Sequence, residues 1–310
     1  MTARAPILTF GMTAGAKDRG SALLLVLWAL LLLSAAVFAF AKWVQQDIQL
    51  HGEANRELEA RAMSHSGLAI ALHPAVTQQT PGLEETFPGG LGYQVKMVSE
   101  GGKLNIRWLL EGEDPRKITI LKQWLEARDL TFDERERFVD CLLDWVDADN
   151  VHRLNGVEDD GDYHPPNRAL QSVEEIAQVR GSEALTRTEG WKDALTIYSQ
   201  GPLDLSSVDA DTLRFVPGFS DANIQRFIQF RRGRDNVDNT EDDHQFKDLE
   251  AVRLFLGLSK EQAKAFGGLV MVKDQTLRIT SEGHSANAYR RVEVVVVKTA
   301  GNPKILSWKE

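Results

Sequence analysis

An uncharged apolar segment near the N terminus constrains this chain more than any other feature of its sequence. Residues 21–41 read SALLLVLWALLLLSAAVFAFA, without a charged residue or a proline. At the rise of an α-helix this segment spans about 30 Å, the thickness of bilayer hydrocarbon. Three basic residues precede it against a single acid. This flank predicts one membrane pass, with the N terminus in the cytoplasm and everything after Lys42 exported.

The segment admits three interpretations. It could be a secretory signal, because Ala39-Phe40-Ala41 supplies the small-x-small pattern of a cleavage site. It could be a plain uncleaved anchor. In the third interpretation a charged leader ends at Gly20 and is removed there, because the apolar segment starts directly after this glycine, at Ser21.

The helix predicted for this segment does not stop at the membrane edge. Residues 42–72 contain no proline, and their apolar residues recur close to the helical period. His73-Pro74 then ends the pattern, because a residue that precedes proline is pushed out of the α region. The sequence therefore predicts one helix over 21–72, about 78 Å long, with an apolar first half and an amphipathic second half.

A charged leader that ends in Gly20 before such a helix resembles the type IV prepilin family, which includes the pseudopilins of type II secretion. The resemblance implies that a membrane-bound prepilin peptidase cleaves between Gly20 and Ser21 and methylates the new N terminus. It also implies that the apolar half of the helix packs against neighbouring subunits in a filament. Most members carry a glutamate at the fifth mature position, which is Leu25 here. Within the family, the absence of this glutamate marks the subunit proposed for the filament tip.

The exported part reads as strands at both ends and helices between them. Alternating residues predict a β-hairpin from 93–98 and 103–108, with a glycine turn between the strands. Three further strands are predicted at 276–282, 289–298 and 304–308. We therefore expect an α+β fold, in which the long pilin helix packs on a small antiparallel sheet that is split around a large helical insertion.

The expected organisation has five parts along the chain. They are a cytoplasmic leader at 1–20, the transmembrane half of the helix at 21–41, its periplasmic half with the first strands at 42–113, the helical insertion at 114–271 and the closing strands at 272–310. The chain has 310 residues, which is about the length of two domains.

A short pattern recurs within the insertion, where a polar cap opens a short helix that ends near a glycine. Its three copies begin at Ser172, Ser207 and Asp248. Ser220 and Ser259 then cap second helices at 222–231 and 260–266. The central copy, 203–232, looks like a helix-hairpin-helix, a module that often holds DNA. Five acids follow its arginines and the chain has a net charge of −9, so we expect a packing role rather than contact with nucleic acid.

Two acidic clusters, 144–162 and 235–243, are candidate calcium loops. The first holds seven acids and the second five, interleaved with asparagine and glycine. Calcium takes six to eight oxygen ligands from such loops, although neither cluster has the spacing of an EF-hand. The candidate ligands are Asp147, Asp149, Glu158, Asp159, Asp160, Asp162, Asp235, Asp238 and Asp242. We predict calcium at the first cluster, whereas calcium and a solvated acidic loop remain equal alternatives for the second.

The sequence indicates a structural protein rather than an enzyme. It lacks the nucleophile-elbow, zinc-protease and phosphate-loop patterns. Its single cysteine, Cys141, lies among apolar residues and reads as a small buried hydrophobe.

Several motifs in order resemble the protein K family of type II secretion, a family of minor pseudopilins. They are the leader ending at Gly20, Leu25, the run at 142–149, the acids at 158–160, Asn167-Arg168-Ala169-Leu170, Pro217-Gly218 and the closing strand with Trp308. The resemblance implies calcium in the acidic loops and a tip complex with the I and J minor pseudopilins. It further implies contact with the major pseudopilin and the inner-membrane assembly platform, from an inner-membrane anchor with the bulk of the chain in the periplasm.

The function expected from this resemblance is to initiate or cap the pseudopilus that exports proteins across the outer membrane. Two alternatives stay open. One is a minor pilin of a type IV pilus or a DNA-uptake filament. The other is a membrane-anchored exported binding protein outside any filament.

Overall fold

The computed structural model describes residues 18–299 and 301–310, with side chains from Ser21 onward. Residues 1–17 of the predicted leader therefore lie outside the described residues. Contacts divide the chain into two compact units, Met1–Leu58 and Glu59–Glu310.

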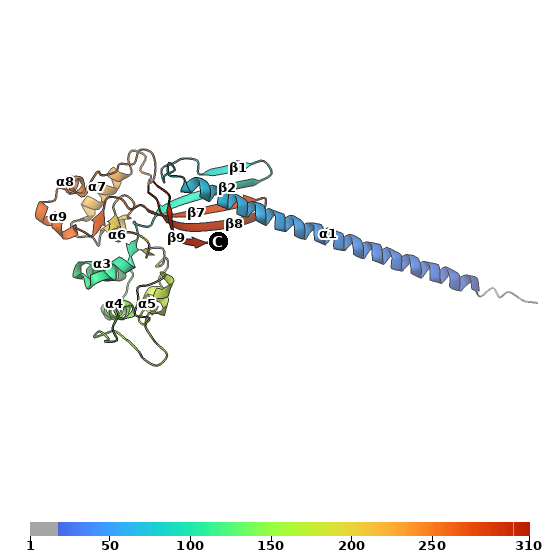
Figure 1. Cartoon of the computed structure of the whole chain (residues 1–310), viewed down its shortest axis with the longest axis horizontal. Helices are drawn as coiled ribbons and strands as arrows, with labels where there is room; N and C mark the ends of the chain where they lie inside the picture. The colour runs from blue at the N-terminus through green and yellow to red at the C-terminus, as the bar shows by residue number, and fades with distance from the viewer. Residues whose placement is uncertain (1–17, 300) are drawn as a thin grey trace, which may run out of the picture. The chain divides into compact units, whose positions relative to one another are not determined.

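Helix α1 runs without interruption from Asp18 to Leu72 (Figure 1). It confirms the single long helix that the sequence predicts and ends at the predicted residue, before His73-Pro74. Among the described residues it is the one helix that is long and apolar enough to cross a membrane. The large apolar side chains of its first half, including Leu25 with 71% of its surface exposed, are exposed in the isolated chain.

A five-stranded antiparallel sheet follows, in the order β1-β2-β7-β8-β9 (Figure 1). Its strands are β1 (Glu84–Phe87), β2 (Leu91–Ser99), β7 (Thr276–Ser285), β8 (Ala288–Val297) and β9 (Lys304–Lys309). The three C-terminal strands confirm the predicted segments, and β7 has the alternation of buried and more exposed residues that one buried face requires. In β8, Val292, Val294 and Val296 alternate along the strand and are buried.

The last turns of α1 pack on the buried face of this sheet. Leu68 and Ala71 lie in one apolar cluster with Ile279 and Val294. Gly283 allows the helix and strand β7 to approach closely, because a Cβ at this position would overlap backbone atoms of Ala60 and Ser64. The ammonium group of Lys298 donates to the carbonyl oxygens of Ala71, at 2.5 Å, and of Val76. The sheet therefore satisfies the carbonyl end of the helix that it supports.

The predicted hairpin from 93–98 and 103–108 is wrong. Residues 93–98 do form part of β2, but β2 pairs with β1 and β7. The second segment becomes β3 (Leu104–Asn105), which pairs in parallel with β4 (Leu195–Thr196), and then helix α2 (Ile106–Leu110). The side chain of Asn105 accepts from the backbone amide of Trp108 at 3.1 Å. This cap starts a helix within the six alternating residues predicted to form a strand. Alternation over so few residues does not distinguish a strand from the start of a helix.

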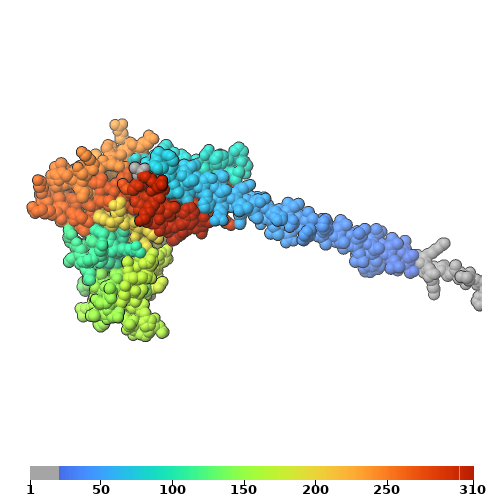
Figure 2. Space-filling view, in the orientation of Figure 1, coloured from blue at the N-terminus to red at the C-terminus, as the bar shows by residue number. Residues whose placement is uncertain are grey.

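The insertion lies between two neighbouring, paired strands, since the chain leaves the sheet after β2 and returns at β7. Its helices are α2, α3 (Pro115–Glu126), α4 (Phe132–Val146), α5 (Glu183–Thr186), α6 (Ala210–Leu213), α7 (Asp221–Arg231), α8 (Leu249–Leu256) and α9 (Lys260–Phe266), with 3-10 turns η1 (Glu111–Glu113) and η2 (Glu174–Gln178). A short parallel pair, β5 (Leu203–Asp204) and β6 (Val270–Met271), joins its second half. Figure 2 shows two lobes, the green-yellow first half and the orange second half. One apolar core runs through both.

The predicted caps of α7, α8 and α9 are confirmed, whereas Asp209 rather than Ser207 caps α6, and the copy that begins at Ser172 forms the 3-10 turn η2. Ser220 and Ser259 accept from backbone amides in the first turns of α7 and α9, and Asp248 does the same for α8. Gly257 ends α8 in the left-handed region, with φ of 69°. These positions follow from local chemistry, since a short polar side chain before a helix and a glycine after it satisfy the free backbone groups.

A buried ionic junction ties the insertion to the sheet. Glu100 lies directly after β2 with its side chain fully buried. It accepts from Arg278 at 2.7 Å and from Lys103 at 3.0 Å. Burial alone raises the pKa of the Glu100 carboxyl, but the hydrogen bond from Arg278 and the charges of Lys103 and Arg278 outweigh it, so the net pKa lies below its ordinary value.

We predict that Gly283→Ala destabilises the fold, because the new methyl group meets backbone atoms of α1 that cannot move aside. The free energy of unfolding should fall by about 1–3 kcal/mol, the usual cost of overpacking. Urea unfolding of the detergent-solubilised chain, followed by tryptophan fluorescence, measures the change. Gly52→Ala is the control, since a Cβ at Gly52 meets no atom within 4 Å; equal stability of the two variants would contradict the close approach.

We also predict that Glu100 makes the fold acid-sensitive. A carboxyl whose pKa is lowered on folding contributes stability above its unfolded value of 4.5, and this contribution is lost as the pH falls through the lower folded pKa. Glu100→Gln should therefore lower the stability at neutral pH and flatten its decline below pH 4.5. Glu261→Gln, at an exposed ion pair with Lys264, is the control. Parallel pH profiles for wild type and Glu100→Gln would disprove this role.

Candidate metal centre

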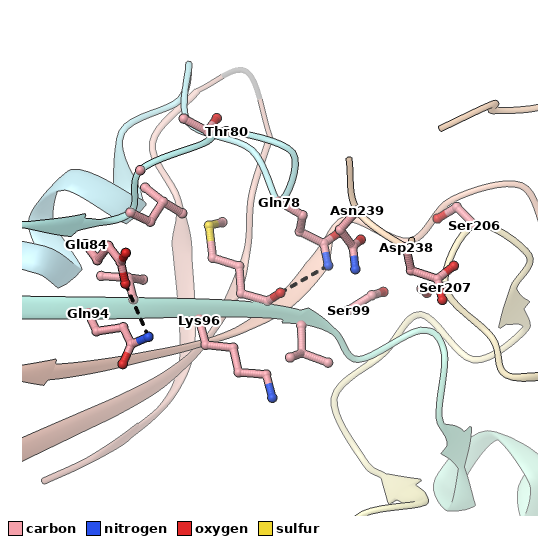
Figure 3. Close-up of a pocket in the computed structure, with 15 residues that line it drawn as sticks. Gln78, Thr80, Glu84, Gln94, Lys96, Ser99, Ser206, Ser207, Asp238 and Asn239 are labelled. Carbon is pink, nitrogen blue, oxygen red and sulfur yellow. Dashed lines mark hydrogen bonds between the residues drawn. The ribbon is translucent and has the colours of Figure 1, made fainter. Parts of the chain in front are cut away.

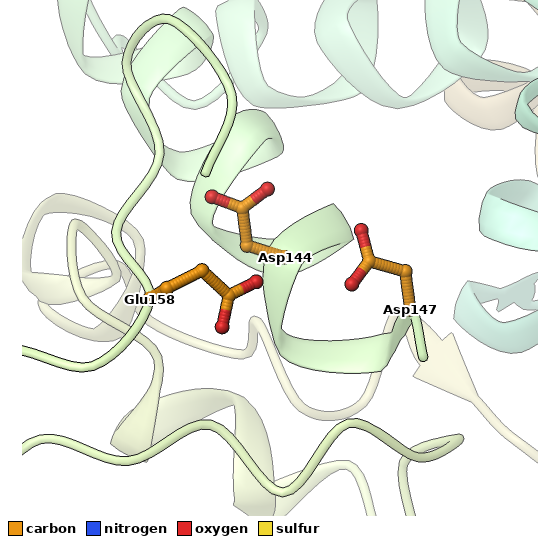
Figure 4. Close-up of side chains that lie close together, drawn as sticks. All are labelled: Asp144, Asp147 and Glu158. Atoms are coloured by element: carbon orange, nitrogen blue, oxygen red, sulfur yellow. The ribbon is translucent and has the colours of Figure 1, made fainter. Parts of the chain in front are cut away.

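Three carboxylates from the first acidic cluster converge in the structure. Asp144 and Asp147 lie one helical turn apart at the end of α4, and Glu158 comes from the loop that follows. Figure 4 shows the three side chains directed toward one another, and one oxygen from each lies within 4.8 Å of the others. Among the described residues, this is the group of three acidic, histidine or cysteine side chains that lie close enough together to share one metal ion.

Packing of α4 holds the first two carboxylates in place. The neighbouring residues Leu142, Leu143 and Trp145 are buried in the core of the insertion. The side chain of Asp144 is itself fully buried, whereas that of Asp147 is 22% exposed. The helix therefore cannot rotate the two carboxylates out toward solvent without exposing its apolar face.

Arg153 lies against two of the three carboxylates. Its Nη1 donates to Asp144 Oδ1 at 2.6 Å and to Asp147 Oδ2 at 2.5 Å. Its Nη2 donates to Glu113 Oε1, at 2.7 Å, in the turn before α3. The guanidinium thus uses one oxygen of Asp147 and leaves the other, Oδ1, unpaired.

Three buried oxygens of this region have no hydrogen-bond partner among the described residues: Asp147 Oδ1, Glu158 Oε1 and Asn167 Oδ1. The amide nitrogen of Asn167 donates to Asp149 O and to Asn150 Oδ1, both at 2.8 Å. This orientation fixes the amide oxygen as the free group. Buried acceptors without donors are costly, so the region is incomplete as a purely protein structure.

Glu158 also lacks a positive partner for its negative charge. It is 92% buried, since only 8% of its surface is exposed. Burial raises the pKa of its carboxyl, and the negative charges of Asp144, Asp147, Asp149 and Asp159 raise it further. A cation beside Glu158 Oε1 would remove both penalties. Carboxylate and amide oxygens are the ligands of hard cations such as calcium.

The structure separates the other predicted ligands of the first cluster from this site. Asp149 is exposed, and its Oδ1 accepts from the amide of Val151 at 2.8 Å. Asp159 lies 2.8 Å from His164, Asp160 is paired with Arg180, and Asp162 is exposed. Only Asp147 and Glu158 of the predicted ligands in this cluster thus meet at the three-carboxylate group.

Two residues of the site were missing from the predicted ligands. The i, i+3 spacing of Asp144 and Asp147 on a helix could have indicated Asp144, because such residues share a face. Asn167 follows Glu158 by nine residues of irregular chain. Its position depends on how that loop returns to α4, and no local sequence pattern encodes this.

The second acidic cluster has protein partners for each predicted ligand. Asp238 accepts from Arg231 at 2.9 Å and from Arg232 at 2.8 Å. Asp242 accepts from the amide of Arg234 at 2.6 Å, and Asp235 accepts from that of Val237 at 2.9 Å. Figure 3 shows Asp238 and Asn239 with Ser206 and Ser207 on one side of a cavity of about 490 Å³ whose other side is β2.

The helix-hairpin-helix-like unit uses its arginines and aromatic residues for packing. Arg231 is buried and donates to the carbonyl of Val208 at 2.6 Å, and Arg226 donates to that of Phe255 at 2.9 Å. Phe227 stacks on Phe246, with ring centroids 5.3 Å apart. These contacts favour the packing role that the sequence predicts.

The fold defines the class of this protein. A long N-terminal helix, apolar enough in its first half to cross a membrane, packs with its last turns on an antiparallel sheet, which is an architecture similar to that of pilin-like proteins. A large helical insertion between two paired strands distinguishes the chain within that class.

Comparison with known proteins makes the class more specific. Residues 102–189 match the family model described as "Type II secretion system (T2SS), protein K". The chain is 32% identical over 87 residues to the Type II secretion system protein K of Dickeya chrysanthemi, and this match covers 27% of the chain and 23% of the relative. The aligned stretch thus spans about a quarter of that relative's length.

A solved structure is similar over most of the chain. It is a chain of the crystal structure of the GspK-GspI-GspJ complex from the enterotoxigenic Escherichia coli type 2 secretion system, with a TM-score of 0.58 and 12% identity. The similarity covers 86% of this chain and 98% of the other, and at this identity it describes the fold alone. Together the comparisons confirm the resemblance to protein K of type II secretion. The family match also contains the three-carboxylate group.

Proposed function

We propose that this protein is a minor pseudopilin at the tip of a type II secretion pseudopilus, where it initiates or caps the filament. The observation that carries the proposal is the insertion between β2 and β7 of a pilin-like sheet, whose first part, residues 102–189, matches the protein K family model. Bulk at this position would prevent another subunit from stacking above. The role is structural rather than enzymatic.

The membrane half of α1 supports the same assignment. Its exposed apolar surface suits lateral packing against other pilin helices in a bilayer, where van der Waals contact drives association. Leu25 occupies the position at which most prepilins carry a glutamate. A subunit without this group lacks the usual ionic partner for an adjoining N terminus, which suits the end of a filament.

The partners follow from the same proposal. The related solved structure is titled as a complex with GspI and GspJ, so we propose I-type and J-type minor pseudopilins as direct partners here. Prepilin peptidase, the inner-membrane assembly platform and the major pseudopilin would act on or join the assembled tip. The N terminus would lie in the cytoplasm and the insertion in the periplasm.

We further propose that the three-carboxylate group holds calcium. Asp147 and Glu158 would supply their unpaired oxygens, with Asn167 and Asp144 beside them. The bound ion would cross-link the end of α4 to the irregular chain after it. No described helix or strand lies between α4 and η2 to hold this chain by backbone hydrogen bonds. We do not extend this proposal to 235–243, because arginines and backbone amides already hold its candidate ligands.

The processing of the N terminus tests the proposed function. We expect the mature chain, extracted from membranes of a strain with its own prepilin peptidase, to start at Ser21 and to carry one added methyl group. It should co-purify with I-type and J-type partners, and Gly20→Val should abolish cleavage. Intact-mass spectrometry measures the first residue, the methyl group and the effect of Gly20→Val on cleavage. A chain that starts at Met1 or Lys42 would point to an anchored protein outside any filament, and salt-dependent DNA binding would point to a DNA-uptake filament.

Glu158→Gln tests the calcium site. Calcium should raise the Tm of the wild-type chain, because a ligand that binds only the folded state stabilises it by about 2.7 kcal/mol at a hundredfold excess over Kd. The variant should lose most of this rise. In chelator it should be at least as stable as wild type, because the raised pKa of Glu158 means that its buried charge is unfavourable.

Asp160→Asn is the matched control, since Asp160 lies in the same acidic stretch but pairs with Arg180. It should keep the calcium-dependent rise. Differential scanning calorimetry in calcium and in chelator measures all three proteins. Equal calcium responses in wild type and Glu158→Gln would contradict the assignment.

A further inference from the structure

Arg153 and a bound cation would use different oxygens of the same carboxylate. The guanidinium occupies Oδ2 of Asp147, whereas Oδ1 of Asp147 and Oε1 of Glu158 are buried and unpaired. Glu158 is more than nine-tenths buried. The three-carboxylate group therefore has two places where a positive charge can bind. The guanidinium of Arg153, which does not lose its charge, fills one of them.

The position of Arg153 does not depend on its side chain alone. Its backbone amide also donates to the carboxylate of Asp144, at 3.2 Å from Oδ2. Nearby, Asn155 donates to Asp140 Oδ2 through its backbone amide, at 3.1 Å, and through its side chain, at 2.9 Å. Replacing the Arg153 side chain would leave these bonds intact, so the loss would be one positive charge with its hydrogen bonds to Asp144, Asp147 and Glu113.

We propose that Arg153 is a built-in counter-cation of the calcium site, which keeps the acidic loop folded when calcium is scarce and limits the affinity for calcium when it is present. The proposal rests on the calcium site proposed above. With the guanidinium in place, one of three converging negative charges is cancelled without an ion. The same positive charge repels a divalent ion bound at the remaining oxygens.

Arg153 also connects the site to the start of the insertion. Its second nitrogen, Nη2, donates to Glu113 Oε1 between α2 and α3. Glu113 has φ of 49°, in the left-handed region. The counter-cation therefore joins three segments, at residue 113, at the end of α4 and in the loop before Glu158, before any ion is added.

The test compares Arg153→Met, which removes the charge, with Arg153→Lys, which keeps it. Calcium binding to the full detergent-solubilised chain is measured by isothermal titration calorimetry, and Tm is measured in chelator. Arg153→Met should bind calcium about tenfold more tightly or better, the effect of one unit charge on a divalent ion a few ångströms away even when water screens it. Its Tm in chelator should fall. Arg153→Lys should stay close to wild type in both measurements.

Arg180→Met is the control, because Arg180 pairs with Asp160 outside the three-carboxylate group, and its calcium affinity should not change. Weaker binding by both Arg153 variants would overturn the proposal and make the shape of the guanidinium the deciding property. Unchanged binding by Arg153→Met would overturn it as well. Absence of calcium binding by wild type would instead disprove the calcium site, and the role of Arg153 with it.

Discussion

The backbone at the end of α1 lies directly against strand β7, and the rest of the compact unit Glu59–Glu310 depends on this contact. Gly283 makes the approach possible, because any side chain there would overlap the helix backbone. Lys298, directly after β8, then donates to the carbonyl of Ala71 in the last turn of the helix and to that of Val76 beyond its end. A helix held at both its face and its end gives the sheet one dry side, and the alternating valines of β8 fill that side.

The insertion depends on the sheet in turn, because it leaves and returns through two adjacent strands. Such an arrangement places both ends of a long segment at one point, where little apolar surface is available. The structure fills this point with buried charge instead, in the pair formed by Glu100 and Arg278. A buried pair of this kind fixes one geometry strongly, since separating it would leave a charge without a partner.

The three-carboxylate group also buries charge, but here negative charge exceeds positive charge. At the junction the charges are matched within the protein, whereas beside α4 the acids outnumber the single guanidinium of Arg153. The raised pKa of Glu158 and the unpaired oxygens of Asp147 and Asn167 are two expressions of this excess. The five-stranded sheet could carry the insertion without a cation, but the irregular chain after α4 contains buried acceptors without a hydrogen-bond partner, which a bound cation would satisfy.

The sequence by itself determined the features that local periodicity and caps encode. These are the single helix that ends before His73-Pro74, the three C-terminal strands, and the capped helices α7, α8 and α9. In the three-carboxylate group, it indicated the acidic segment and two of its residues, Asp147 and Glu158. Only the tertiary structure decided which strands pair with β2, that Asp144 joins these carboxylates and that the amide oxygen of Asn167 is buried without a partner. The reason is physical: strand partners and converging loops depend on contacts between segments far apart in the chain, whereas periods and caps depend on neighbours within one turn.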